Sequence, residues 1–241
     1  MENPTDRRRF LNAALGAGIV LSGCSMNFNT SARNDKEHPG EEPEGGEEEV
    51  APAEDLMREH GVLKRVLLVY GEAIRRIDSN QDLPPEAVAD SANIIRTFIE
   101  DYHEQLEEQH LFPRFRKANM LVDLVDVLTE QHKAGRAVTD ITIRYANAQS
   151  LRDANNRRQL ADSMRQFIRM YNPHEAREDT VLFPALRKII SAHEYGALGE
   201  DFEKKEHELF GEEGFEKMVD RVAGIEKSLG IYDLSQFTPK V

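Results

Sequence analysis

The chain of 241 residues has no tryptophan, a single cysteine and few aromatic residues, 7% of the total. One cysteine excludes an internal disulfide, so the fold cannot depend on such a bond. The formal net charge is −13, and an acidic surface repels nucleic acid rather than binding it. No apolar run after residue 25 is long enough to span a bilayer. We therefore expect an acidic globular domain with no nucleic-acid partner.

The first 24 residues have the features of an export signal. Arg7–Leu11 fit the twin-arginine pattern, and a short apolar segment leads to Leu21–Cys24, which is similar to a lipobox. We expect residues 1–24 to be a twin-arginine lipoprotein signal peptide, with Cys24 as the lipidation site. The protein would then be a periplasmic lipoprotein, anchored to a membrane through lipid on Cys24. The alternative is a cytoplasmic protein with a fortuitously basic start.

Residues 25–53 and the rest of the chain differ in pattern. The first of these segments interleaves glutamate with glycine and proline and has no hydrophobic periodicity, which predicts an acidic disordered tether. The remainder reads as helices with few strand signals. The expected class is all-α, an up-down-up-down four-helix bundle with two extra short C-terminal helices. The bundle is expected over 54–190 and the extension over 191–241, with helices at 54–77, 84–117, 122–148, 153–190, 198–210 and 216–229.

An internal repeat is the most specific signal in the sequence. His103 is followed four residues later by Glu107, and His174 by Glu178; Leu-Phe-Pro follows each pair at 111–113 and 182–184. Residues four apart on a helix lie on one face, so each pair presents an imidazole and a carboxylate in the same direction. Where a bundle brings two such faces together, the carboxylates can bridge two metal ions.

The other two predicted bundle helices each add a histidine, His60 and His132. The resulting donor set has one imidazole per helix and a carboxylate on two helices, a mixture of nitrogen and oxygen ligands that suits iron. A lone histidine is usually a core or surface residue, but four histidines and two glutamates at this spacing favour a metal site. Glu108 and Asp179, next to the paired glutamates, are expected to face solvent.

These motifs resemble the hemerythrin-like, HHE cation-binding family over about residues 54–190. The resemblance implies a centre of two iron ions with an oxo or hydroxo bridge, and dioxygen binding at an open iron position. His60 and His103 would serve one iron, and His132 and His174 the other. It also implies that Glu107 and Glu178 bridge the two ions.

One position departs from the oxygen-carrying hemerythrins, which use five histidines, two of them four apart on the third helix. Here Arg136 stands four residues after His132, so one iron would have a further open position. His110 is a possible extra ligand, because its direction on the helix falls within about 60° of the paired residues. His207, beyond the bundle, is a weaker candidate.

Three functions remain open. The first is binding or sensing of dioxygen, nitric oxide or peroxide at the cell envelope. The second is a di-iron redox enzyme that reduces peroxide or nitric oxide or oxidises iron. The third is a regulatory lipoprotein in which a metal, zinc included, only stabilises the bundle. Ferritin-type ligation needs Glu-x-x-His on two helices, and only Glu100–His103 fits, since Tyr171 replaces the second glutamate.

Overall fold

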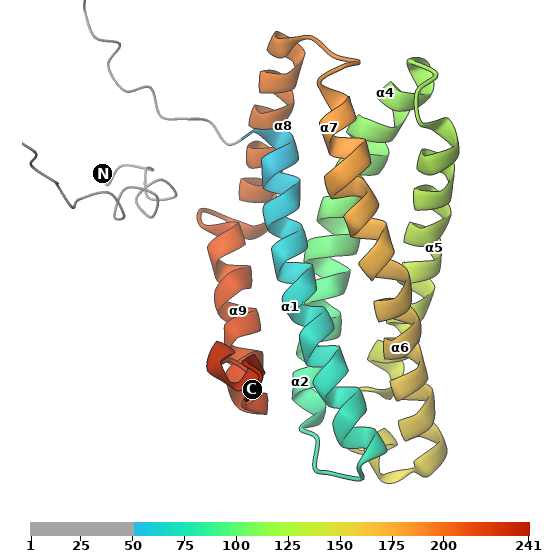
Figure 1. Cartoon of the computed structure of the whole chain (residues 1–241), viewed down its shortest axis with the longest axis vertical. Coiled ribbons are helices and arrows are strands. Elements are labelled where there is room, and N and C mark those ends of the chain that lie inside the picture. The colour runs from blue at the N-terminus through green and yellow to red at the C-terminus, as the bar shows by residue number, and fades with distance from the viewer. Residues whose placement is uncertain (1–50) are drawn as a thin grey trace, which may run out of the picture. The chain divides into compact units, whose positions relative to one another are not determined.

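The computed structural model describes residues 51–241 (Figure 1), and every regular element in that range is a helix. The predicted all-α class is therefore confirmed for this part of the chain. The expected signal peptide with Cys24, and the tether up to residue 50, lie outside the described residues. Helix α1 begins at Pro52, inside the segment expected to be tether, because proline is well tolerated in a first helical turn.

Four long helical stretches run side by side (Figure 1). They are α1 (Pro52–Asp78), a second stretch that combines α2 (Pro85–Ile94), α3 (Glu104–Leu106) and α4 (Phe112–Lys117), then α5 (Val122–Tyr145), and a fourth that combines α6 (Ala154–Arg177) and α7 (Phe183–Leu186). Two further helices follow, α8 (Ala192–Phe210) and α9 (Gly214–Leu229), and short 3-10 turns lie at Ser150–Arg152 and Leu234–Phe237.

The contacts among these helices form a ring. α1 packs on α2 and α6, and α5 packs on the same two helices from the other side. α8 lies against α1, and α9 lies against α1 and α2, so the two helices cover one side of the ring. The interior is filled by aliphatic and aromatic side chains that are almost inaccessible to solvent, among them Leu56, Val66, Phe98, Phe167 and Leu160, and their burial is the main stabilising contribution.

π-helical turns interrupt the second and fourth stretches. They occur at Ile95–His103, Glu107–Leu111 and Glu178–Leu182. The last two begin at matching glutamates of the repeat and end just before the Phe-Pro pairs, where proline lacks the amide proton that an α-helical bond would use. The sequence predicts ordinary α-helix here, so the π-helical turns are a correction. They are frequent at functional sites because they redirect side chains.

Two predicted boundaries differ from the structure. The fourth stretch ends at Leu186, short of the predicted residue 190, and α8 begins at Ala192, ahead of the predicted 198. Ser191 caps α8 by accepting a hydrogen bond from the Glu194 amide at 3.1 Å. A serine followed three residues later by glutamate is a capping-box sequence, which predicts the start of a helix. No helix among residues 51–241 is long and apolar enough to cross a membrane.

Candidate metal centre

Four buried histidines from the four helical stretches meet in the interior. His60 comes from α1, His132 from α5 and His174 from α6, while His103 ends the first π-helical segment. Each is at most 4% exposed. Each lies on the apolar side of its helix, so the packing that buries the core also carries the four imidazoles inward.

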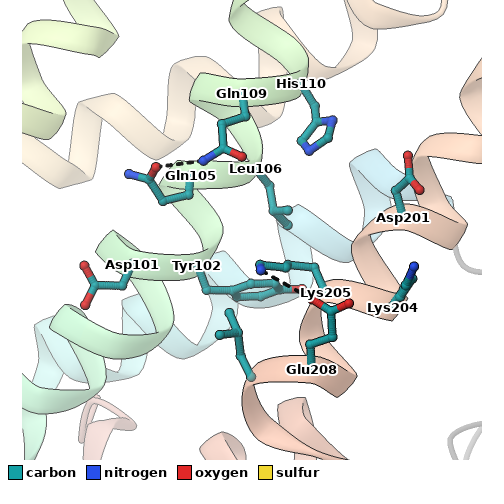
Figure 2. A pocket seen from close by; sticks show the side chains of 11 residues that line it. Asp101, Tyr102, Gln105, Leu106, Gln109, His110, Asp201, Lys204, Lys205 and Glu208 are labelled. Carbon is teal, nitrogen blue, oxygen red and sulfur yellow. Dashed lines mark hydrogen bonds and ion pairs between the residues drawn. The ribbon is translucent and has the colours of Figure 1, made fainter.

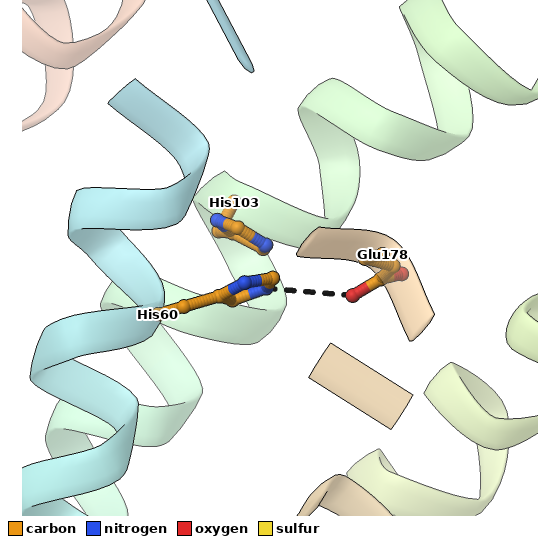
Figure 3. Close-up of side chains that lie close together, drawn as sticks. All are labelled: His60, His103 and Glu178. Atoms are coloured by element: carbon orange, nitrogen blue, oxygen red, sulfur yellow. Dashed lines mark ion pairs between the residues drawn. The ribbon is translucent and has the colours of Figure 1, made fainter. Parts of the chain in front are cut away.

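The histidines and Glu178 form two groups with metal-ligand spacing. His60, His103 and Glu178 place one donor atom each within 4.8 Å of one another (Figure 3), and His132, His174 and Glu178 do the same. Glu178 Oε2 lies 3.4 Å from His60 Nε2, and Oε1 lies 3.1 Å from His174 Nε2. The two oxygens of a single carboxylate therefore face different groups.

Glu107 lies opposite, within reach of both groups. Its Oε2 atom is 3.8 Å from His103 Nε2 and 3.4 Å from His132 Nε2. Glu107 and Glu178 are both fully buried. The structure thus brings together all six residues that the sequence singles out as metal ligands, and both carboxylates lie between the two histidine pairs.

Each histidine is oriented through its second nitrogen. His103 Nδ1 is 2.7 Å from Glu59 and His60 Nδ1 is 2.7 Å from Asp179. His132 Nδ1 is 2.9 Å from Glu108, and His174 Nδ1 is 2.9 Å from the side-chain oxygen of Gln131. An acceptor at Nδ1 keeps the proton there and leaves the Nε2 lone pair facing inward, as metal-binding histidines require.

The sequence reasoning missed these orienting roles. It placed Glu108 and Asp179 in solvent, but their side chains are only 25% and 35% exposed and each holds a histidine. It did not single out Glu59 or Gln131. The available signal was adjacency, because every one of the four acceptors directly precedes or follows a predicted ligand in the chain.

The polar atoms at the centre fit a cation. His103 Nε2 and all four carboxylate oxygens of Glu107 and Glu178 are buried without a hydrogen-bond partner among residues 51–241. His132 Nε2 and His174 Nε2 are only 3.2 Å apart, and both point their lone pairs inward when Nδ1 holds the proton. Burying polar atoms without a partner costs free energy, and a cation bound between them would remove that cost.

The pKa values of the buried histidines and glutamates are shifted by burial and by their charged neighbours. Burial would lower the pKa of His60, but Asp179 and Glu178 outweigh it and raise the pKa to about 10. Burial, and then the charge of Glu178, raise the pKa of Glu107. Burial and then His60 lower the pKa of His103. A cation favours the deprotonated form of every ligand, so binding would release the protons for which these groups compete.

Aromatic rings close the centre. Phe183 stacks on His60 with ring centroids 5.6 Å apart, and Phe112 stacks on His132 at 5.4 Å. Both phenylalanines are 1% exposed. They come from the Leu-Phe-Pro ends of the two motif copies, so the repeat supplies both the ligands and the apolar cover above them.

Arg136 stands where a fifth histidine would be, and its side chain turns to two carboxylates. Its Nη2 atom is 2.8 Å from Glu104 and 2.8 Å from Glu108. Glu104 also accepts a 2.5 Å hydrogen bond from the buried Tyr171 hydroxyl. Arg136 therefore contributes charge to the residues around His132 and no ligand atom.

The structure places the two additional histidine candidates away from these groups. His110 lines a cavity of about 470 Å³ between the second stretch and α8 (Figure 2). Its ring also meets Phe202 edge-on at 5.6 Å. His207 is an exposed residue of α8. Neither belongs to a histidine and glutamate group with metal-ligand spacing within the described residues.

A family model decides the class of the protein. The hemerythrin HHE cation-binding domain matches residues 51–150 and again 123–238, together more than half of the chain. The chain belongs to the hemerythrin HHE family. A cation-binding domain of this family accounts for the two groups of buried histidines and glutamates, which could hold metal. The two matches overlap at α5, in agreement with the internal repeat.

Similar chains occur in mycobacteria. The uncharacterized proteins Rv1995 of Mycobacterium tuberculosis and Mb2018 of Mycobacterium bovis are each 52% identical to this HHE protein, over 97% of this chain and 91% of their own length. No solved structure shows a significant match.

Proposed function

We propose that this HHE protein holds two iron ions between its motif pairs and binds dioxygen, nitric oxide or peroxide there. The observation that carries the proposal is the shared Glu178, whose two oxygens lie 3.4 Å from His60 and 3.1 Å from His174. A carboxylate that faces two histidine pairs in this way would hold one ion with each of its oxygens. Glu107, which faces His103 and His132, is the second bridge.

The donor chemistry supports iron. Four imidazoles and two carboxylates, with no thiolate, suit a metal of intermediate hardness. Bound iron would supply one-electron redox chemistry and a coordination position for a small ligand. The oxo or hydroxo bridge implied by the family belongs to the same proposal.

Other residues around the centre would orient its ligands and control access to it. The acceptors at each Nδ1 hold the four imidazoles in one tautomer and one direction. Phe112 and Phe183 exclude water from the centre. Arg136 replaces a ligand with a charged residue that binds Glu104 and Glu108, and so leaves room for a small molecule beside His132 and His174.

We further propose how the four helices are arranged and where the protein is located. The ring of contacts among α1, α2, α5 and α6 supports an up-down-up-down four-helix bundle over residues 54–190. The twin-arginine pattern at Arg7–Leu11 and the lipobox at Leu21–Cys24 support export and lipid attachment at Cys24 in the periplasm. Export of folded protein would allow iron to be loaded first.

Metal analysis and an aerobic spectrum test this function together. The purified full chain should contain about two iron ions, and the anaerobically reduced protein should change colour in air. Reversal under argon indicates binding, whereas irreversible oxidation indicates the alternative, a di-iron redox enzyme. Zinc alone, or one iron or none per chain, contradicts the proposal. His207→Ala is the matched control for histidine variants, because His207 is exposed.

A further inference from the structure

A third group of buried carboxylates lies beside the metal centre. Asp55 and Glu59 come from α1 and Glu206 from α8. Asp55 is 6% exposed, and the other two are fully buried. One carboxylate oxygen from each lies within 4.8 Å of the other two. None of the three is among the six residues assigned above to the iron ions.

Each of these carboxylates is fixed by a contact of its own. Glu59 Oε2 is 2.7 Å from His103 Nδ1, Glu206 Oε1 accepts the Phe215 amide at 2.8 Å, and Asp55 Oδ1 is 3.7 Å from Arg58 Nη1. The group is therefore held in place by residues of α1, of α9 and of the π-helical segment Ile95–His103. What sets it apart is that three buried carboxylates from two helices place their oxygen atoms within 4.8 Å of one another.

The phenol of Tyr102 is a second and independent sign of a ligand. Tyr102 is 1% exposed, and its hydroxyl makes no hydrogen bond of normal geometry within residues 51–241. Burial, and then the charges of Glu59, Glu206 and Asp55, raise the pKa of Tyr102, in agreement with a hydroxyl close to this group. Tyr102 also lines the cavity between the second stretch and α8 (Figure 2).

We propose that Asp55, Glu59 and Glu206 form a separate site for a hard divalent cation such as Mn²⁺, with the Tyr102 hydroxyl beside the ion. Oxygen ligands at about 2.0–2.6 Å from a cation lie close enough together to match the observed spacing. Carboxylate-only sites favour Mg²⁺, Mn²⁺ or Ca²⁺ over softer metals. Because Glu59 also holds His103, the ion would adjoin the iron pair without sharing a ligand with it.

Among residues 51–241, the opposite side of the ring has no group of three carboxylates with this spacing; there Glu104 and Glu108 lie close to His132 instead. The position that corresponds to Asp55 in α5 is Val127, which is 53% exposed, and Gln131 takes the place of Glu59. α8 packs on α1 and brings Glu206 to it. Within the described residues, the group of three carboxylates therefore depends on α8.

Titration of the iron-loaded full chain with Mn²⁺ tests the site. Free Mn²⁺ is followed by electron paramagnetic resonance, and iron is counted in the same samples. We expect one Mn²⁺ to bind in addition to iron, and Glu206→Gln to weaken it by about tenfold or more. This variant removes the charge and keeps an oxygen acceptor for the Phe215 amide. Glu203→Gln, an exposed neighbour on α8, is the matched control and should bind as the parent does.

Three results would overturn the site: no Mn²⁺ beyond iron, equal binding by Glu206→Gln and Glu203→Gln, or binding unaffected by Asp55→Asn. Asp55→Asn serves as the second variant if circular dichroism shows Glu206→Gln to be unfolded. A failure of iron loading is visible in the iron count. It contradicts the two-iron function, while the difference in Mn²⁺ binding between the parent and Glu206→Gln still decides the separate site.

Discussion

The two halves of the ring build the metal centre from matching contacts. In the first half, α1 supplies His60 and the second stretch supplies His103 and Glu107; in the second half, α5 supplies His132 and the fourth stretch supplies the His174–Glu178 pair. Within each half, the residue before the single histidine accepts from the paired histidine. Between the halves, the residue after each paired glutamate accepts from the single histidine of the other half. The repeat extends beyond the ligands.

An ion pair next to the metal centre also occurs in both halves. Lys64, one turn after His60, forms an ion pair with the buried Glu175. Arg136, one turn after His132, pairs with the buried Glu104. The position that departs from the oxygen carriers is thus occupied by a basic residue in both halves. This likeness indicates that Arg136 belongs to the repeated frame of the site and is not an isolated loss of a ligand.

The halves differ in three places. Glu59 has a neutral counterpart in Gln131. Tyr171 stands three residues before His174, where the other copy has Glu100. α8 packs on α1 and on the second stretch, which both belong to the first half, and it brings Glu206 there. The two halves therefore have the same histidines and glutamates at matching positions but different surroundings. The variants below test how far the two halves are alike.

The largest difference is expected between the two bridging glutamates. Glu178 belongs to both histidine groups, so Glu178→Ala should remove nearly all bound iron. Glu107→Ala should leave one histidine and glutamate group intact on each side and retain part of the iron. Iron per chain after gel filtration measures both. Equal losses would show that the two bridges are equivalent, and full retention in Glu178→Ala would contradict its role.

Single-histidine variants test the likeness of the two sides directly. His60→Ala and His132→Ala each remove one imidazole from one group, so each should lower the iron content by about one ion per chain. His207→Ala should lower it by none. Loss of both ions from one variant and of neither from the other would show that the sites fill in order and are not alike.

Gly135→Ala tests the packing that is particular to the second half. An added Cβ would lie 2.2 Å from the Tyr171 hydroxyl, so that buried ring must shift, at a cost of about 1–3 kcal/mol in the free energy of unfolding. Gly71→Ala meets nothing within 4 Å and should stabilise its helix by about 0.5–1 kcal/mol. Urea unfolding measures both, and equal effects would contradict the close packing.

The smallest effect is expected when the acceptors at Nδ1 are made alike. Gln131→Glu gives His174 a carboxylate partner, as His103 has in Glu59. A charged acceptor makes the imidazole a stronger ligand, so iron should be released by a chelator more slowly, by less than about tenfold. Gln109→Glu, on the exposed side of the second stretch, is the control. Faster release would reverse the assigned role of the acceptor.

The sequence predicted which histidines and glutamates meet in the interior better than it predicted their surroundings. The spacing of His103 with Glu107 and of His174 with Glu178 is local, and helix geometry is enough to place each pair on one face. The partners of Nδ1 depend on which helices become neighbours, which local spacing does not state. The π-helical turns depend on the packing around Pro113 and Pro184. The capping-box residues Ser191 and Glu194 indicate that α8 begins at residue 192, whereas the predicted helix began at residue 198.

Low-temperature Mössbauer spectroscopy of the protein loaded with ⁵⁷Fe tests the central claim most directly. Two ferric ions bridged by Glu107 and Glu178 should couple, so the oxidised protein should give quadrupole doublets and no magnetic splitting in a weak applied field. Glu130→Ala, which changes an exposed glutamate of α5, should give the same spectrum. A magnetically split spectrum from isolated ferric ions would contradict the shared centre.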